Sequence, residues 1–535
     1  MASPAALFST HFVARLMRPD AEDAFPGQMM SQQELLGHAL HHQAQISTIA
    51  QLEALRTPPR EAERIFPALL EAEAEKFQCP VSVGVPGIAP SHPSRQIVKT
   101  LRRIDIMVAP DDAESEAAAL EWAVAHRALS RGGIGFVSRP IDAKAFVWLD
   151  TLESLWAKGQ QTPKTVWRCL ERLSRVAQRS FMDVELAVLS HASSLTSFSE
   201  FPIGLMTLPY DTAPLCCRIP IAYRPLVPLT RTVQFELSPV STTYLQGQLK
   251  VLVAECIPTD DIVGRISRRG WATAGRRVSE VANLTLHVRE ISSAAELRSA
   301  LREDTYDLLV ISAHGFVDRN QHRTGFLCGH ERVVEEELGP LPPMVCFSAC
   351  QVSPRGRGTT NITDLMFRQG AIVILGTLVP IDVRRNTVLM TRFFANIAEA
   401  LQGKMPKNSF EAVWQFTMSS NAFNDILSSN TALAHWASER QEGQSVIEEF
   451  MLHRSRGRLR PGHIYQDTEA VLRDIAKDRG ILNRFHAWMQ SQGYIPESLF
   501  YAVLGWPERI VFYDAQYEKV FNQQNTSSGF DGSSA

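Results

Sequence analysis

At 535 residues with 45% hydrophobic side chains, the chain is long enough for two or three domains with cores of their own. Its 54 basic and 57 acidic residues give a net charge of −3, which does not point to nucleic acid or to an anionic membrane. We expect no membrane span, because no stretch approaches about 18 uninterrupted apolar residues, and no signal peptide. The eight cysteines include no Cys-x-x-Cys pair, which favours reduced thiols in a cytoplasmic protein over disulfides or a zinc site.

The first 240 residues contain predicted elements but no catalytic motif. Helices are predicted over 31–56, 114–129, 143–158 and 163–178, and strands over 104–109 and 134–137. Between 200 and 240, seven prolines interrupt short apolar runs, which indicates loops or edge strands and a domain boundary. We therefore expect a regulatory or partner-binding region over 1–240, either mixed α/β or mainly helical, with a second domain starting near Tyr244.

From residue 249 onward, strand-like and helix-like segments alternate. Strands are predicted over 249–254, 284–290, 306–312, 344–349, 371–375 and 499–504, and helices over 262–282, 294–302, 361–369 and 386–401. This alternation predicts an α/β domain with a mostly parallel sheet flanked by helices, over residues 241–520. The polar, Ser- and Gly-rich segment 521–535 is predicted to be a disordered tail.

Two of the predicted strands lead into residues with reactive side chains. The strand 306–312 is followed by Ala-His314-Gly315, and the strand 344–349 ends in Ser-Ala-Cys350. Parallel sheets carry their sites at the carboxyl ends of their strands, so we expect His314 and Cys350 to lie close together. A thiol needs a nearby base to become a thiolate, and imidazole supplies one near neutral pH. The pair therefore predicts a cysteine hydrolase, with the backbone amides of Gly315 and Cys350 as candidates for binding an oxyanion.

Acidic residues near the same edge are candidates for binding substrate. Asp382 follows the strand 371–375, and a carboxylate there would pair with a basic P1 residue, the residue on the amino side of the scissile bond. Asp260 and Asp261 follow the first strand of the domain and compete for that role, and Ser348 is a further candidate for contacting substrate.

Basic residues near the site lead to two further expectations. Arg384 and Arg385 would suit an acidic P1 residue, but they begin the next helix and we expect them to point outward. The basic segment Arg355-Gly-Arg-Gly358 is predicted to be a flexible, protease-sensitive loop.

Residues 245–515 resemble the CHAT family of caspase-like cysteine peptidases. The resemblance rests on Ala313-His314-Gly315, Ser348-Ala349-Cys350, the run from Gly370-Ala into the strand that leads to Asp382, the helix with Phe393-Phe394, and Gly505-Trp506-Pro507. Two positions depart from the family pattern and affect the expected shape of the pocket. Gln351 and the residues after it replace a frequent Glu-Thr-Gly, and the segment before Asp382 lacks the usual tryptophan.

The resemblance implies a His314 base, a Cys350 nucleophile and no metal or organic cofactor. It also implies bacterial defence or programmed cell death, with a protein substrate such as a bacterial gasdermin and a possible sensor or activator partner. Two alternatives stay open: a catalytically silent CHAT-like scaffold that binds a partner through the same cleft, and a nucleotide-binding α/β module. The second is disfavoured because neither Gly-x-Gly-x-x-Gly nor a P-loop follows the first strand of either half.

Overall fold

The computed structural model describes most of the chain between residues 79 and 514. The described residues are 79–87, 89, 113–131, 133–209, 211–226, 232–233, 236, 242–279, 283–318, 320–334, 337–356, 358–405, 407–441, 443–460, 462–491 and 493–514. The helix expected over 31–56, the strand expected over 104–109 and the expected tail over 521–535 lie outside these residues.

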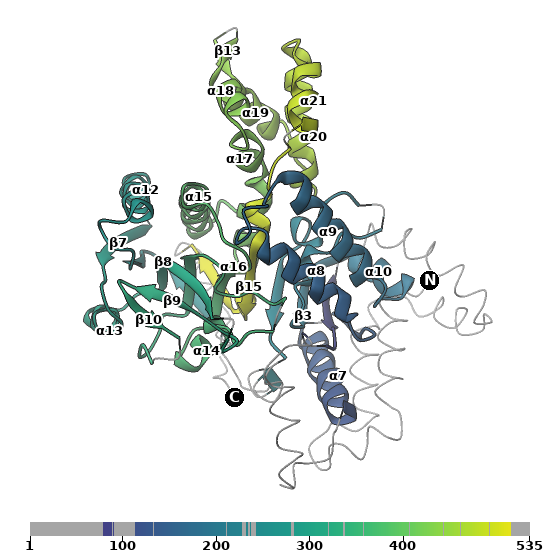
Figure 1. Ribbon diagram of the computed structural model, residues 1–535, viewed down its shortest axis with the longest axis vertical. Coiled ribbons are helices and arrows are strands. Elements are labelled where there is room, and N and C mark those ends of the chain that lie inside the picture. Colours follow the sequence, from purple (N-terminus) through teal and green to yellow (C-terminus); the bar gives the residue numbers. More distant parts are fainter. Residues whose placement is uncertain are drawn as a thin grey trace, which may run out of the picture.

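Within the described residues, one sheet holds twelve of the strands. They are β1 (Cys79–Gly84), β2 (Ile134–Val137), β3 (Ala192–Phe198), β4 (Ile221–Arg224), β6 (Leu249–Glu255), β7 (Leu284–Glu290), β8 (Leu308–Asp318), β9 (Arg323–Cys328), β10 (Glu331–Val333), β11 (Met344–Ala349), β12 (Val373–Thr377) and β15 (Tyr501–Gly505). Their order is β10-β9-β8-β11-β12-β15-β4-β3-β1-β2, and β6 lies between β8 and β7. In Figure 1, β15 lies between β8 and β9 on one side and β3 on the other.

The mostly parallel sheet that the sequence predicts is built on β6, β7, β8, β11 and β12, whereas β9 and β10 pair antiparallel. β7, β6, β8, β11 and β12 pair in parallel, and β15 pairs antiparallel with β12. The helices are α12 (Ile262–Ser279), α13 (Ala294–Glu303), α14 (Ile362–Met366) and α15 (Val383–Leu401). Helices α12 and α15 cover one face of the sheet, and α13 and α14 lie on the other (Figure 1). We call residues 242–514 the C-terminal half; its α/β class is confirmed.

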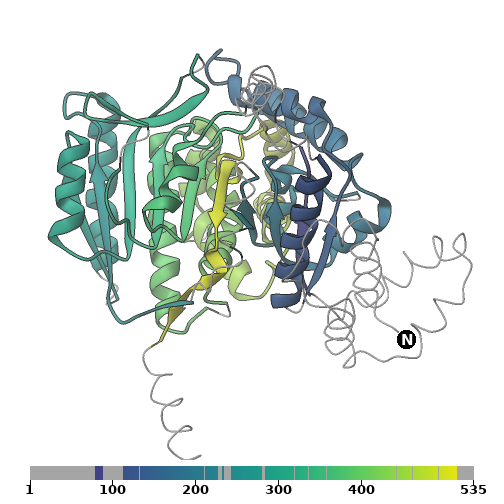
Figure 2. The same cartoon turned by 90° about the horizontal axis from the view of Figure 1, so that it is seen from below.

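Residues 79–226 form an N-terminal half with the same kind of layering. β1 pairs in parallel with β2 and β3, and β3 pairs in parallel with β4. The helices are α7 (Ala113–Ser130), α8 (Ala143–Ser154), α9 (Pro163–Gln178) and α10 (Asp183–Ser190). Figure 2 shows the strands of both halves following one another across the molecule. The sheet therefore continues across the boundary that the prolines suggested.

The prediction of loops or edge strands over 200–240 was wrong for β4. This strand lies inside the sheet between β3 and β15, and all four of its residues are buried. Pro220 and Pro225 lie immediately outside it, so neither removes an N–H from the four residues that pair. The prolines therefore flank a short central strand, which joins the two halves through the pair Leu504–Tyr223.

Buried charges also join the halves beside β4. The guanidinium of Arg224 is fully buried and forms ion pairs with Glu236 at 2.8 Å and with Glu508 at 3.0 Å. Arg127 of α7 also pairs with Glu508, which follows β15. Breaking a buried pair by removing one partner leaves an uncompensated charge, so these contacts make separation of the halves costly.

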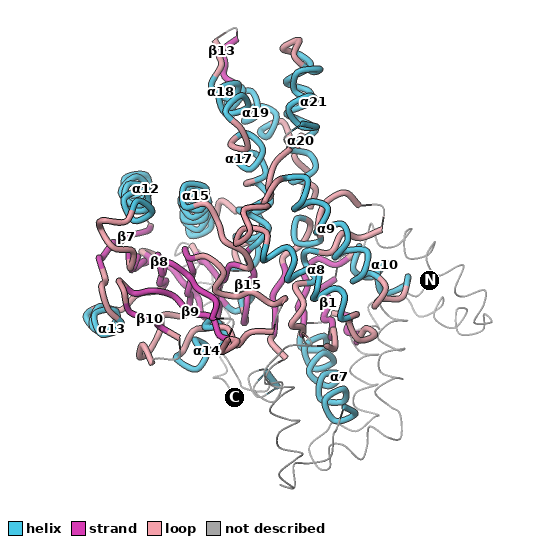
Figure 3. The backbone as a smooth tube through the Cα atoms, viewed as in Figure 1, coloured by secondary structure: helices cyan, strands magenta, loops and turns pink. Residues whose placement is uncertain are grey.

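A helical segment lies between α15 and β15 in the sequence. It consists of α16 (Phe410–Ser420), α17 (Ala422–Leu427), α18 (Thr431–Ser438), α19 (Val446–Ser455), α20 (Ile464–Asp478) and α21 (Leu482–Ser491), with the small strands β13 (Arg440–Gln441) and β14 (Gln444–Ser445). Figure 3 shows α18 to α21 projecting beyond the sheet layers. Two further strands, β5 (Thr243–Gln246) and β16 (Ile510–Tyr513), pair in parallel. None of the helices in the described residues has both the length and the apolar character needed to cross a bilayer.

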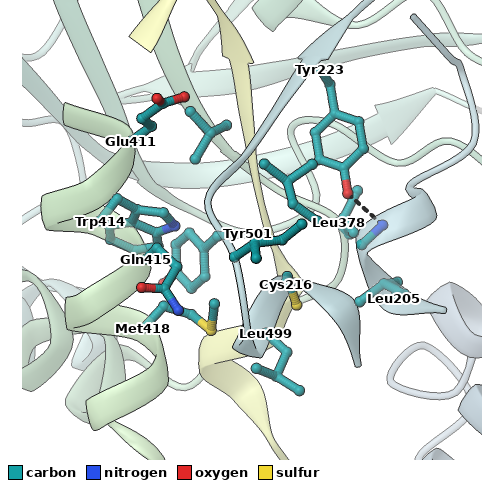
Figure 4. Close-up of a pocket in the computed structure, with 14 residues that line it drawn as sticks. Leu205, Cys216, Tyr223, Leu378, Glu411, Trp414, Gln415, Met418, Leu499 and Tyr501 are labelled. Carbon is teal, nitrogen blue, oxygen red and sulfur yellow. Dashed lines mark hydrogen bonds between the residues drawn. The ribbon is translucent and has the colours of Figure 1, made fainter. Parts of the chain in front are cut away.

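A small cavity of about 20 Å³ lies where the halves meet, with room for roughly one water molecule. Its walls include Tyr223 of β4, Trp414 and Met418 of α16, and Tyr501 of β15 (Figure 4). The Tyr223 hydroxyl accepts a hydrogen bond of 2.9 Å from the Gly204 amide. The cavity is a packing gap of the junction and contains neither His314 nor Cys350.

Candidate active site

His314 lies at the point where β8 changes its pairing partner. Ala313 is the last β8 residue that pairs with β11, and His314 is the first that pairs with β9, opposite Leu327. The sequence predicted that this strand ends at residue 312, but it continues to Asp318 as one arm of a hairpin. His314 therefore lies at the carboxyl edge of the parallel ladder, although its own strand runs on beyond it.

Cys350 lies at the same level of the sheet on the neighbouring strand. β11 ends at Ala349, which pairs with Ala313, so that His314 and Cys350 each follow the last parallel pair by one residue. The backbone of Gly315 touches the carbonyl group of Cys350, and a methyl group on Gly315 would overlap that carbonyl oxygen. The fold therefore brings the two sequence-predicted residues side by side at the backbone level.

The His314 side chain is bound to Asp261. The distance between His314 Nε2 and Asp261 Oδ2 is 3.0 Å, and both side chains are about one-third exposed. Asp261 is fixed at the start of α12, where its Oδ1 accepts a 2.6 Å hydrogen bond from the amide of Val263. The hydrogen bond with His314 lowers the pKa of Asp261. Asp261 was a sequence candidate for binding substrate, and here it contacts the proposed base; its neighbour Asp260 is exposed.

The Cys350 thiol has a hydrogen-bond partner of its own. Its Sγ donates to the carbonyl oxygen of Ile381 at 3.7 Å. Burial raises the pKa of this thiol, and the nearby carboxylates of Glu497 and Asp382 raise it further. In this arrangement the sulfur is therefore a protonated thiol whose hydrogen-bond partner is a carbonyl.

Asp382 caps the helix α15. Its Oδ1 accepts hydrogen bonds from the amides of Arg384 at 2.8 Å and Arg385 at 3.1 Å, while the residue as a whole stays exposed. Its own amide donates to Glu497 Oε2 at 3.1 Å. The carboxylate that the sequence suggested for a basic P1 residue thus lies near Cys350 and already has two backbone donors.

Glu497 is a residue near the thiol that the sequence analysis missed. It precedes β15, and its Oε1 accepts a 2.9 Å hydrogen bond from Arg385 Nη1. Arg385 therefore points to a carboxylate instead of outward as expected, whereas Arg384 is exposed. Glu497 lies 147 positions after Cys350 in the sequence (497 − 350), and a single glutamate before an apolar strand carries no signal of such proximity.

Ser348 lies beneath the site. It is buried, and its hydroxyl accepts a hydrogen bond from Asn386 Nδ2. The Oδ1 of Asn386 in turn accepts from the Tyr501 hydroxyl at 2.6 Å. These contacts tie the end of β11 to α15 and to β15.

The prediction that the Arg355 segment is a flexible surface loop was wrong. Arg355 is buried, and its guanidinium pairs with Glu200 at 2.7 Å and with Asp364 at 2.8 Å. Glu200 is 155 positions away from Arg355 in the sequence. Asp364 is nearer but belongs to the helix α14, and the pattern of the sequence does not show that it contacts Arg355. A run of arginine and glycine is typical of exposed loops unless buried acids are present to pair with it.

Comparisons with known proteins agree with the resemblance. Residues 269–438 match the family model of the CHAT domain, and this stretch includes both His314 and Cys350. The resemblance that the motifs indicated is therefore confirmed for this stretch. A search among curated proteins finds no match.

Solved structures of two proteins align with the chain at low identity. The Arg-specific cysteine proteinase gingipain R aligns with a TM-score of 0.33 and 10% identity, over 82% of this chain and 79% of that one. Separase of Saccharomyces cerevisiae, in a complex with securin, aligns with a TM-score of 0.28 and 9% identity, over 61% of this chain and 26% of that one. A second structure of the same complex aligns with a TM-score of 0.29 and 10% identity, over 78% and 32%. The chain thus corresponds to about a third of separase or less.

Proposed function

We propose that the chain is a cysteine endopeptidase in which Cys350 is the nucleophile and His314 the base. The observation that carries the proposal is the register of β8 and β11, which sets the two residues side by side within the CHAT match. The Asp261 carboxylate adds a third group that orients the imidazole, as the third member of a catalytic triad does. No metal or organic cofactor takes part in the steps below.

The contacts of His314 define its working tautomer. With the proton on Nε2 and directed at Asp261, the lone pair is on Nδ1, which becomes the base. The thiol leaves the Ile381 carbonyl by rotation about its Cα–Cβ bond, and its proton passes to Nδ1. The thiolate then attacks the scissile carbonyl carbon, and the amides of Gly315 and Cys350 bind the oxyanion.

The second half of the reaction returns the enzyme to its starting state. The protonated imidazole gives its proton to the leaving amine, which leaves a thioester between Cys350 and the acyl part of the substrate. Water then attacks the thioester carbonyl while His314 takes its proton, and the proton returns to the departing sulfur. Because burial raises the pKa of the free Cys350 thiol, we expect its proton to pass to His314 mainly when substrate is bound.

For specificity we propose a basic P1 residue. Both Asp382 and Glu497 lie close enough to Cys350 to raise its pKa, so the region around the thiol is acidic. Glu497 is already paired with Arg385, which leaves Asp382 as the principal partner for an arginine or lysine. Asp260 is a more distant candidate on the loop after β6. An acidic P1 residue would lie beside these carboxylates without a basic partner, and this would weaken its binding by several kcal/mol.

The biological role that we propose follows from the family resemblance alone. The substrate is a cytoplasmic protein, such as a bacterial gasdermin, and cleavage takes part in defence or programmed cell death under the control of a sensor or activator. The same cleft in a scaffold protein would bind a partner without cutting it.

The test is cleavage of a peptide library by the purified full-length chain, by Cys350→Ala and by His314→Ala. Cleavage by the natural chain after Arg or Lys, abolished in both variants, is the expected result. Library cleavage that persists in Cys350→Ala would show that another residue is the nucleophile. No cleavage by any of the three, with a partner protein captured equally by all, would identify a scaffold.

A further inference from the structure

The residues directly after Cys350 adopt a backbone conformation that needs external support. Gln351 has a φ of 51°, in the left-handed region that non-glycine residues rarely occupy. Such a conformation persists only where the surrounding contacts hold it. Because Gln351 is bonded directly to Cys350, whatever holds it also sets the position of the nucleophile.

The C-terminal half supplies only part of this support. The amide of Ser353 donates to the Thr377 carbonyl at 2.9 Å, and the Thr324 hydroxyl donates to the Val352 carbonyl at 2.9 Å. These bonds fix the middle of the segment 351–356 against β12 and β9. They leave the Gln351 side chain and the amides of Arg355 and Gly356 to be satisfied from elsewhere.

Glu153 of α8, in the N-terminal half, accepts these remaining donors. Its backbone carbonyl accepts a 3.0 Å hydrogen bond from Gln351 Nε2. Its carboxylate Oε1 accepts from the amides of Arg355 at 2.8 Å and of Gly356 at 3.1 Å. The Gly356 backbone also packs directly on Asp150, where a methyl group on Gly356 would overlap the Asp150 backbone.

Glu153 is well placed for this role because it cannot easily move. It is 3% exposed and lies in the last turn of α8, whose apolar side includes Phe146 packed edge-on against Phe201. The Arg355 guanidinium does not pair with Glu153, because Glu200 and Asp364 bind it. Two acids of the N-terminal half thus hold the segment 351–356. Glu153 binds backbone amides of the segment, and Glu200 binds the Arg355 side chain.

We propose that Glu153 is a positioning residue for Cys350, through which the N-terminal half holds the segment 351–356 in its left-handed turn. The N-terminal half is then a required part of the active site. The catalytic consequence rests on the proposed peptidase function, whereas the structural coupling does not.

The test compares three variants of the full-length chain. Glu153→Ala removes the carboxyl oxygens that accept from the Arg355 and Gly356 amides but keeps the backbone carbonyl that accepts from Gln351. Glu153→Gln keeps a side-chain oxygen in their place, and Glu185→Ala removes an equally buried acid of the N-terminal half that caps α10. Hydrogen exchange of the amides in 351–356 is measured alongside thermal unfolding. We expect exchange about tenfold faster or more in Glu153→Ala, near-natural exchange in Glu153→Gln, and no local change in Glu185→Ala.

A kinetic measurement on the same proteins separates this proposal from the proposed function. With a chromogenic peptide amide, kcat is expected to fall about tenfold or more in Glu153→Ala, with KM almost unchanged and recovery in Glu153→Gln. A natural chain without any cleavage would contradict the peptidase function, while the exchange result would still decide the coupling. Unchanged exchange in Glu153→Ala, no recovery in Glu153→Gln, or an equal local change in Glu185→Ala would overturn the proposal.

If Glu153→Ala fails to fold, Gln351→Asn decides the matter. Asparagine tolerates the left-handed conformation, but its amide is one methylene too short to reach the Glu153 carbonyl. Faster exchange of the segment and a lower kcat in this variant support the coupling. Natural exchange and natural kcat contradict it.

Discussion

Asp261, just before α12, and His314, within β8, lie 53 positions apart in the sequence and meet through a 3.0 Å hydrogen bond between Oδ2 and Nε2. The carboxylate is anchored by the first turn of α12, so it orients the imidazole at the edge of the parallel pairing between β8 and β11. On the other side, the Cys350 thiol donates to the Ile381 carbonyl. The resting site therefore has an oriented base and a protonated nucleophile, each with its own partner, and the approach of substrate has to bring them into reaction.

Asp261→Asn is expected to lower kcat by about tenfold to a hundredfold, because the imidazole loses the anion that fixes its tautomer and stabilises its protonated form. Steady-state kinetics on a chromogenic peptide measure the effect. Asp304→Asn is the matched control, because it also removes a partly exposed carboxylate that has a partner, here Lys250 at 3.0 Å, and it should leave kcat within about twofold. Natural kcat in Asp261→Asn would mean that the hydrogen bond has no part in the chemistry.

Gly315→Ala should lower the free energy of unfolding by about 1–3 kcal/mol, because its methyl group would overlap the Cys350 carbonyl oxygen. Urea unfolding measures the change. The control is Gly275→Ala in α12, where the nearest atom to the added methyl lies 3.9 Å away and a helical alanine is favourable. Equal stability of Gly315→Ala and the natural chain would show that β8 and the Cys350 segment are not in tight contact.

The free energy of unfolding should fall as pH rises, because Glu153 is buried. Burial raises the pKa of Glu153 to about 8 from an ordinary 4.5, so between these values the folded state holds a proton that the unfolded state has lost. The free energy of unfolding therefore falls across this range, by a few kcal/mol from this group alone.

Glu153→Gln, which cannot ionise, tests that pH dependence. Urea unfolding at pH 5.5 and pH 8.5 should show a smaller fall in the variant than in the natural chain. Asp425, whose pKa burial raises to about 7, acts in the same direction, but it is present in both proteins and cancels in the comparison. An identical fall in both proteins would contradict the buried, protonated state of Glu153.

Residues 242–535 alone are expected not to form a stable folded unit. Without the N-terminal half, β15 loses β4 as its neighbour. Glu153, which binds the backbone amide of Arg355, and Glu200, which binds its side chain, are lost as well, so that Asp364 alone remains as an acidic partner. Circular dichroism and thermal unfolding of the purified fragment test this expectation. A cooperative transition near that of the full chain, together with full peptidase activity, would show that the N-terminal half is dispensable.

The sequence predicted β7 and β11 with the bounds that the structure shows. The parallel pairing of β8 with β11 brings His314 and Cys350 together, each one residue after the last pair. Apolar runs between helical patterns determine such elements locally. The continuation of β8 beyond His314 was missed because a hairpin depends on β9 pairing with it, which no single strand reveals.

Long-range partners account for the other differences. The proximity of Glu497 to Cys350 and the pairing of Arg355 with Glu200 join residues about 150 positions apart, so periodicity and composition carry no information about them. The same holds for β4, whose flanking prolines resemble a boundary until β3 and β15 are placed on either side of it.

The measurement that most directly tests the central claim is covalent labelling of the full-length chain with a peptidyl acyloxymethyl ketone carrying Arg at P1. Mass spectrometry of the digested protein locates the adduct. We expect one adduct on the sulfur of Cys350, formed much more slowly in His314→Ala, while the other cysteines, such as the buried Cys346, stay unlabelled. Absence of labelling at Cys350, or labelling at the same rate in His314→Ala, would contradict the assignment of these two residues as nucleophile and base.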